Sequence, residues 1–138
     1  AEKGAPIFGI CNGFQILCEA GLLPGVLLQN LNCRFIDKPV DLKIKNTHGR
    51  FSKGLKVGQT LKIPIAHADG RYFTDAETLK EIEGQGQVFC TYAENPNGSV
   101  GDIAGVMNKQ KNVLGMMPHP ERALFDWSGS TDGKGFFQ

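Results

Sequence analysis

Cys11 occupies a pattern that can turn a thiol into a nucleophile. The segment 9–13 reads Gly-Ile-Cys-Asn-Gly, which is the G-x-S-x-G pattern of a strand-to-helix elbow with sulfur in place of oxygen. We expect glycine at Gly9 and Gly13 because a Cβ at either position would clash across the tight turn. The helix N-terminus should lower the pKa of the thiol, and the Asn12 N–H should donate to an oxyanion. A buried structural cysteine would show the same pattern.

A histidine and a carboxylate lie close together near the other end of the chain. They are His119 and Glu121, within Pro-His-Pro-Glu-Arg at 118–122. A thiol nucleophile needs both groups, because the imidazole takes the proton and the carboxylate holds the imidazole in the correct tautomer. A surface loop could contain the same residues, so this motif gains its meaning only together with Cys11.

Together the two motifs resemble those of the class-I, or triad, glutamine amidotransferases. The resemblance is carried by Gly-Ile-Cys-Asn-Gly-Phe-Gln-Ile-Leu at 9–17 and Gly-Met-Met-Pro-His-Pro-Glu-Arg at 115–122. Shorter matches at 65–72, 95–99 and 103–106 extend it along nearly all 138 residues. It implies an α/β fold of the flavodoxin-like, class-I amidotransferase type, with a mixed sheet between helices. The elbow is then expected at the carboxyl end of a central strand.

The resemblance also implies an activity, the hydrolysis of glutamine to glutamate and ammonia. Cys11 would attack the side-chain amide, and His119 would take the thiol proton and return it to the leaving ammonia. Glu121 would orient His119, and the Asn12 N–H would stabilise the tetrahedral oxyanion. A glutamyl thioester would form and then be hydrolysed by water, as in other covalent mechanisms.

Three further residues are candidates for the glutamine pocket by the same resemblance. Gln15 lies one turn along the elbow helix, and Arg34 and Phe35 fall in a segment that lies near the substrate in related enzymes. A helix-face glutamine, a surface arginine and a core phenylalanine would fit the sequence equally well. His67 also falls in a segment near the site in relatives, but no carboxylate accompanies it, so His119 ranks above it as the base.

Within the family, the sequence looks like the subunits that supply ammonia for purine synthesis, where formylglycinamide ribonucleotide becomes formylglycinamidine ribonucleotide. The chain contains no G-x-x-x-x-G-K-[ST] motif for ATP. The resemblance therefore implies that ATP and Mg²⁺ belong to a PurL-type synthetase subunit, with a small PurS-type subunit as a bridge. We expect no cofactor and no metal site in this chain.

Two rival functions remain compatible with the elbow. A DJ-1/PfpI-like cysteine hydrolase has a similar turn, but its histidine usually follows the cysteine directly, whereas Asn12 follows Cys11 here. A non-catalytic regulatory subunit could also have kept the elbow. The intact set of Cys11, His119 and Glu121 argues against that second alternative.

The composition is that of a soluble globular protein, with 41% hydrophobic residues, 21% charged residues and a net charge of +1. Neither nucleic acid nor membrane is indicated as a partner. The four cysteines show no C-x-x-C or zinc-ligand spacing, and a free catalytic thiol suits a reducing cytoplasm. Residues 1–138 are expected to form one type-1 glutamine amidotransferase domain. We expect it to be incomplete, because the family's first half, with its Gly-Gly oxyanion loop, is not found.

Hydrophobic patterning predicts the elements that position these groups. Strands are expected at 5–8, 40–45, 60–67, 87–93, 103–107 and 113–117. Pro64 restricts its strand to an edge of the sheet or a bulge, and the last two strands should form a hairpin that delivers His119.

Two helices are predicted. The elbow helix should end near Ala20, because Gly21 follows it. A capping box from Thr74 to Glu77 predicts a second helix that stops at Gly84.

Overall fold

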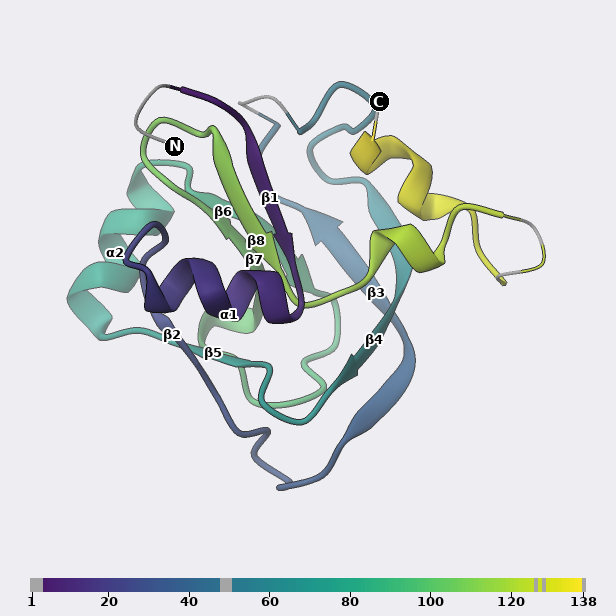
Figure 1. The fold of residues 1–138 in the computed structure, drawn as a ribbon, viewed down its shortest axis with the longest axis horizontal. Coiled ribbons are helices and arrows are strands. Elements are labelled where there is room, and N and C mark those ends of the chain that lie inside the picture. Colours follow the sequence, from purple (N-terminus) through teal and green to yellow (C-terminus); the bar gives the residue numbers. More distant parts are fainter. Residues whose placement is uncertain (1–3, 48–50, 126, 128, 138) are drawn as a thin grey trace.

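A curled, mixed sheet forms the centre of the fold (Figure 1). The computed structural model describes residues 4–47, 51–125, 127 and 129–137. Within them, the six strands run in the order β1-β8-β7-β6-β3-β4. They are β1 (Ile7–Ile10), β3 (Ile36–Ile44), β4 (Thr60–His67), β6 (Val88–Tyr92), β7 (Ile103–Met107) and β8 (Val113–Met116). Only β1 and β8 pair in parallel among these described strands, so the predicted mixed α/β fold is confirmed.

Smaller elements surround this sheet. Helix α1 (Asn12–Glu19) follows β1, and α2 (Ala76–Gly84) precedes β6. Strands β2 (Val26–Leu28) and β5 (Arg71–Phe73) pair antiparallel in a ribbon of their own. The 3-10 turns that the structure describes are η1 (Val100–Asp102), η2 (Pro120–Arg122) and η4 (Asp132–Phe137).

Helix α1 ends as its sequence predicts. Gly21 adopts a φ of 76°, its N–H donates to the carbonyl of Cys18, and the N–H of Leu22 donates to that of Leu17. This pair of bonds is the Schellman arrangement, which satisfies the last helical carbonyls and needs a residue that tolerates a left-handed backbone. The helix therefore stays short, with Phe14 and Leu17 buried on one face.

Helix α2 differs from its prediction at both ends. The N-cap is Asp75, not Thr74, because the Asp75 carboxylate accepts the Thr78 N–H at 2.7 Å. Gly84 lies inside the helix, and the left-handed residue that ends it is Gly86, with a φ of 67°. Both errors have one cause. Thr74 and Asp75 can each cap the start of a helix, and Gly84 and Gly86 can each end one, so the local sequence does not decide which of the two residues takes the role.

The sheet separates two apolar cores. One contains buried side chains of α1 and α2, such as Phe14 and Ile82, with Val106 and Val113 from the sheet. The other core contains the neighbouring residues on the same strands, Met107 of β7 and Leu114 of β8. Alternation along β7 and β8 thus divides their residues between the two faces. Both α-helices lie on one side in Figure 1, and the yellow η4 segment lies on the other.

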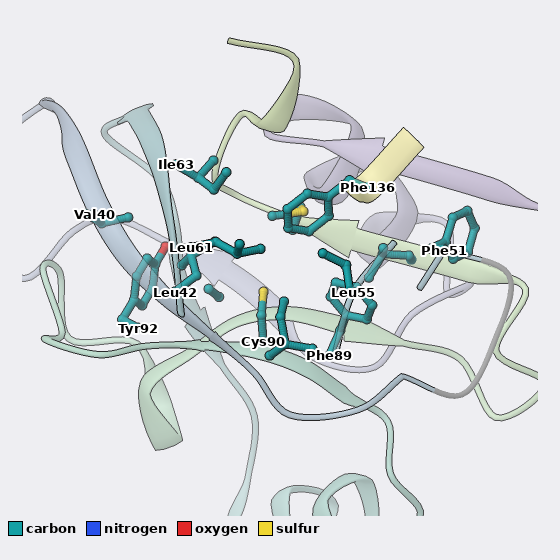
Figure 2. Close-up of a cluster of buried hydrophobic side chains, with 14 of the residues drawn as sticks. Val40, Leu42, Phe51, Leu55, Leu61, Ile63, Phe89, Cys90, Tyr92 and Phe136 are labelled. Carbon is teal, nitrogen blue, oxygen red and sulfur yellow. The ribbon is translucent and has the colours of Figure 1, made fainter. Parts of the chain in front are cut away.

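The second core is closed by segments from the middle and the C-terminal part of the chain. Figure 2 shows Leu61 and Ile63 of β4 converging with Leu55 from a loop and Phe136 from η4. Phe89 of β6 is fully buried and stacks at a tilt against Phe136, with ring centroids 6.0 Å apart. These contacts fill the concave side of the curled sheet.

Strand β1, which carries the elbow, pairs with β8 and lies at the end of the sheet among the described residues. The expected incomplete domain would lack the strands that flank β1 on its other side. The central position of the elbow strand in the complete domain therefore stays a prediction.

The two elbow glycines have different roles. A Cβ on Gly9 would lie 2.7 Å from the backbone of Gly13, whereas a Cβ on Gly13 would meet no described atom within 4 Å. The expectation of a clash at both positions is therefore wrong for Gly13. Helix α1 begins directly over Gly9, so only the residue underneath must lack a side chain.

This asymmetry can be measured. We expect Gly9→Ala to lower the free energy of unfolding by about 1–3 kcal/mol, because the backbone must move to admit a methyl group. Gly13→Ala is the matched control, and it should be neutral or stabilising by up to about 1 kcal/mol, since alanine favours helix. Denaturant unfolding of the full-length protein gives both values. Equal losses for the two variants would contradict the structure.

Candidate active site

Cys11 sits in a strained conformation at the junction of β1 and α1. Its backbone has φ 56° and ψ −107°, a region that residues with a Cβ rarely adopt. The Cys11 N–H extends the β1–β8 ladder by donating to the Met116 carbonyl at 2.8 Å, and the Cys11 carbonyl accepts the first helical bond from Gln15. Bonds on both sides of the residue thus hold the side chain at a sharp turn.

His119 and Glu121 form a close pair at the end of the hairpin. The imidazole Nδ1 lies 2.7 Å from the Glu121 Oε1, so Nδ1 carries the proton and donates it to the carboxylate. The other nitrogen, Nε2, is then an acceptor, and it is buried without a partner among the described residues. This is the tautomer that a general base for a thiol requires.

The outer edge of β4 holds both groups in place. The Pro64 carbonyl accepts the backbone N–H of His119 at 2.8 Å, and the Ala66 carbonyl lies 3.7 Å from Sγ of Cys11. Backbone groups two residues apart in a strand face the same edge. The backbone N–H of Lys62 also lies on this edge, where it donates to the Asp132 carboxylate at 2.8 Å. Pro64 is tolerated there because no ladder bond to β3 is lost, and its predicted edge position is confirmed.

The pKa of the Cys11 thiol is raised, contrary to the prediction from its helix-terminal position. Burial is the largest cause, since it penalises the thiolate. The Asn12 N–H and the Arg122 guanidinium act in the opposite direction, and the Glu121 carboxylate raises the pKa further. The favourable helix terminus exists but is outweighed, so the thiol remains protonated until a base removes its proton.

The other three cysteines are also free thiols. Burial raises the pKa of Cys18 to about 12 and that of Cys90 well above its usual range. Cys33 is exposed in the loop before β3. Cys11 is the cysteine whose pKa Glu121 and Arg122 affect, and its Sγ meets the same edge of β4 as the His119 backbone.

His67 is more closely tied to this site than its sequence suggested. It ends β4, directly after Ala66, and its side chain is 3% exposed. Burial and the nearby His119 lower its pKa to about 4, although Asp69 acts in the other direction. Its Nδ1 lies 3.2 Å from Oδ1 of Asn30, a buried residue that sequence reasoning missed. An isolated asparagine carries no local signal that it will be buried.

The three predicted pocket residues have different surroundings. The Gln15 side chain donates to the Asp69 carbonyl at 2.8 Å, so it binds the turn after β4. Arg34 and Phe35 are exposed, Phe35 by 63%, in the loop that leads into β3. That loop reaches the site end of the sheet, because Ile36 pairs with His67. The structure thus brings all three toward the end of β4 that faces Cys11.

The described residues offer neither a metal centre nor a membrane-spanning helix. Within them, no cluster of three or more histidine, cysteine or acidic side chains is arranged to hold a metal ion. No helix in the same ranges has the length and apolar character needed to cross a bilayer.

Residues 1–135 match the CobB/CobQ-like glutamine amidotransferase domain. The chain belongs to this family. Among curated glutamine amidotransferase relatives, PurQ subunits of phosphoribosylformylglycinamidine synthase are 54% identical in Brucella abortus and 55% identical in Rhizobium meliloti. Each alignment covers 99% of the chain and 62% of the relative, so the chain spans less than two thirds of these proteins.

Solved structures agree with the family assignment. The structure of PurLQS from Thermotoga maritima contains a chain that superposes with a TM-score of 0.90 at 46% identity, covering 99% of this amidotransferase chain and 61% of that one. A Thermoplasma acidophilum protein described as a candidate GMP synthase subunit matches with a TM-score of 0.56 at 15% identity, over 84% of this chain and 48% of that one. The second likeness concerns the fold alone.

The opposing charges beside Cys11 can be tested directly. In a Cys33→Ser background, which removes the exposed thiol, Arg122→Gln should raise the pKa of Cys11, because a stabilising cation is lost. The pH dependence of iodoacetamide labelling would then move to higher pH. Lys43→Gln, the same charge change at the far end of β3, should leave the profile unchanged. A shift to lower pH for Arg122→Gln would contradict the electrostatic arrangement.

Proposed function

We propose that the chain is the catalytic region of a glutaminase that releases ammonia from glutamine. The observation that carries the proposal is the common positioning of nucleophile and base by one strand edge. The Ala66 and Pro64 carbonyls of β4 place the Cys11 thiol and the His119 backbone two residues apart along that edge. A strained thiol beside an imidazole of the correct tautomer can carry out acyl transfer.

The proposed reaction begins with proton transfer from Cys11 to Nε2 of His119. The sulfur then attacks the amide carbon, and the resulting oxyanion accepts the Asn12 N–H at the start of α1. His119 returns the proton to the departing nitrogen, which leaves as ammonia. Glu121 stabilises the imidazolium between these two steps. Water activated by His119 finally hydrolyses the glutamyl thioester to glutamate.

The raised pKa of Cys11 gives His119 a necessary role. A thiol whose pKa is raised by burial holds little thiolate at neutral pH. The Cys11 thiolate must therefore be formed during the reaction, by proton transfer to His119, because little of it exists beforehand. Loss of either partner should then have a similar cost, because the two act as a unit.

The use of the ammonia is proposed from the relatives. The PurQ subunits are named for phosphoribosylformylglycinamidine synthase, and the Thermotoga structure is named PurLQS. We infer that the ammonia converts formylglycinamide ribonucleotide to formylglycinamidine ribonucleotide, and that ATP and Mg²⁺ act on a PurL-type partner. A small PurS-type subunit would complete the assembly. Gln15, Arg34 and Phe35 remain proposed contacts for substrate glutamine at the mouth of the site.

Separating the two ammonia sources tests this proposal. In a complex of the full-length protein with its synthetase, Cys11→Ala should reduce glutamine-dependent synthesis by about 10³-fold or more, and His119→Ala should act similarly. Synthesis from added ammonium chloride should continue, because only the glutaminase has been removed. Cys33→Ala, which removes an exposed thiol away from the pair, is the control. Unchanged glutamine-dependent synthesis by Cys11→Ala would refute the assignment.

Coupling to the partner is a separate expectation. Ammonia released into water is protonated and lost, so hydrolysis should be slow until the synthetase is ready to use it. Glutaminase turnover of the full-length protein should rise when the synthetase and its nucleotides are added together, as expected if docking favours a competent arrangement. An isolated protein that already reaches the rate of the complex would instead be an independent hydrolase.

A further inference from the structure

Two buried imidazole nitrogens near Cys11 lack hydrogen-bond donors. Among the described residues, Nε2 of His67 and Nε2 of His119 are both fully covered and unpaired. His119 and His67 are held by the same strand, because the His119 N–H donates to the Pro64 carbonyl of β4 at 2.8 Å and His67 ends that strand. In agreement with this placement, His119 lowers the pKa of His67. The peptide that precedes His67 carries the Ala66 carbonyl, which lies 3.7 Å from Sγ of Cys11. The mechanism above assigns a role to His119 alone.

Asn30 determines which nitrogen of His67 carries the proton. Its Nδ2 donates to the carbonyls of Arg34 and His67, each at 2.9 Å, so the orientation of the amide is settled. Its Oδ1 therefore faces Nδ1 of His67 at 3.2 Å, and it also accepts the Gly70 N–H at 3.4 Å and Nδ2 of Asn97 at 3.3 Å. The His67 contact is the shortest of the three, and it is a hydrogen bond only if Nδ1 donates. Nε2 of His67 must then be a bare acceptor.

The position of the His67 ring is fixed as closely as its tautomer. A Cβ on Gly70 would lie 2.4 Å from Nδ1 of His67, so the ring packs directly against that backbone. Burial keeps the ring neutral, and it cannot act as an acid at neutral pH, since its pKa is about 4. An unpaired buried acceptor carries a cost in folding free energy, which a site can recover when a donor arrives.

We propose that Nε2 of His67 accepts an N–H of the substrate's side-chain amide nitrogen, which makes His67 a further catalytic residue. This inference rests on the proposed glutaminase function. The donor must be small, because Nε2 of His67 is buried and without a partner among the described residues. The amide nitrogen of glutamine meets this description, and its two N–H groups are the donors that this part of the site lacks.

The acceptor would act when the tetrahedral intermediate collapses. The nitrogen then carries two N–H bonds and one lone pair, and that lone pair must face the protonated Nε2 of His119. A hydrogen bond from one N–H to Nε2 of His67 fixes the rotation of the nitrogen about the C–N bond, so that its lone pair faces His119. The C–N bond breaks as its electron pair moves to nitrogen, the oxyanion re-forms the carbonyl, and the nitrogen takes the proton from His119. Ammonia departs and the Cys11 thioester remains, so atoms, charges and electrons balance.

Two substitutions at one position separate a catalytic role from a structural one. In His67→Asn, the amide N–H₂ replaces Nδ1 and can keep the Asn30 bond, but the acceptor at Nε2 is lost. In His67→Gln, the amide oxygen replaces Nε2 as an acceptor, but the Asn30 bond is lost. A structural role therefore predicts that the asparagine variant is the better enzyme, and a catalytic role predicts the reverse.

A second substrate sharpens the comparison. Glutamate γ-methyl ester forms the same thioester, but its leaving oxygen has no hydrogen for His67 to accept. In the full-length protein with its synthetase, His67→Asn should lower kcat/KM for glutamine by about tenfold or more, the value of one lost hydrogen bond. The same variant should hydrolyse the ester within about twofold of wild type, and His67→Gln should recover glutamine hydrolysis to within about threefold.

Each outcome has a defined meaning. Equal losses on glutamine and ester, or normal glutamine hydrolysis by His67→Asn, would overturn the role of His67. If thermal melting shows that His67→Asn does not fold, Gly70→Ala is the second variant, because its new methyl group would push the His67 ring out of place. A wild-type ratio of glutamine hydrolysis to ester hydrolysis in Gly70→Ala would overturn the proposal. Failure of the proposed glutaminase function looks different, because Cys11→Ala would then hydrolyse both substrates as well as wild type does.

Discussion

The site depends on one constraint, the outer edge of strand β4. Its alternate backbone groups face away from β3, and the Pro64 and Ala66 carbonyls meet His119 and Cys11 there. The strand lies at one end of the sheet and β1 at the other, so this contact exists only because the sheet curls back on itself. The unpaired edge that would otherwise invite association is used to align a nucleophile with its base.

Two opposing effects set the state of the thiol. The turn places Cys11 at the start of α1, where the Asn12 N–H favours a negative charge. The same curling that brings β4 close also removes water from the sulfur, and the desolvation raises the pKa by more than the N–H and Arg122 lower it. The raised pKa therefore keeps the Cys11 thiol protonated near neutral pH, so a thiolate there would need a base close by.

The two histidines of the site are held in the same tautomer by different partners. Glu121 is a carboxylate, so it can support His119 as that ring gains and loses a proton. Asn30 is neutral and buried, so it orients His67 without favouring a charge. The two imidazole rings are thus oriented by different groups at Nδ1. The carboxylate partner lies two residues away and is visible in the sequence, whereas the buried amide partner is 37 residues away and is not.

The sequence by itself determined the local features of this protein. The glycine-flanked Cys11, the Gly21 helix end, the alternation of β4 with its edge proline and the hairpin before His119 all follow from residue chemistry within a few positions. Most strands were accordingly predicted to within about two residues of their observed limits. The family resemblance then supplied the role of each motif.

Only the tertiary structure decided how these pieces act on one another. Cys11 and Ala66 are 55 residues apart in sequence, and Asn30 and His67 are 37 apart. The tolerance at Gly13 and the direction of the Cys11 pKa shift likewise depend on which segments approach. The physical reason is that desolvation and hydrogen bonding fall off within a few ångströms, and those distances are set by the curl and strand order of the sheet, which no local pattern encodes.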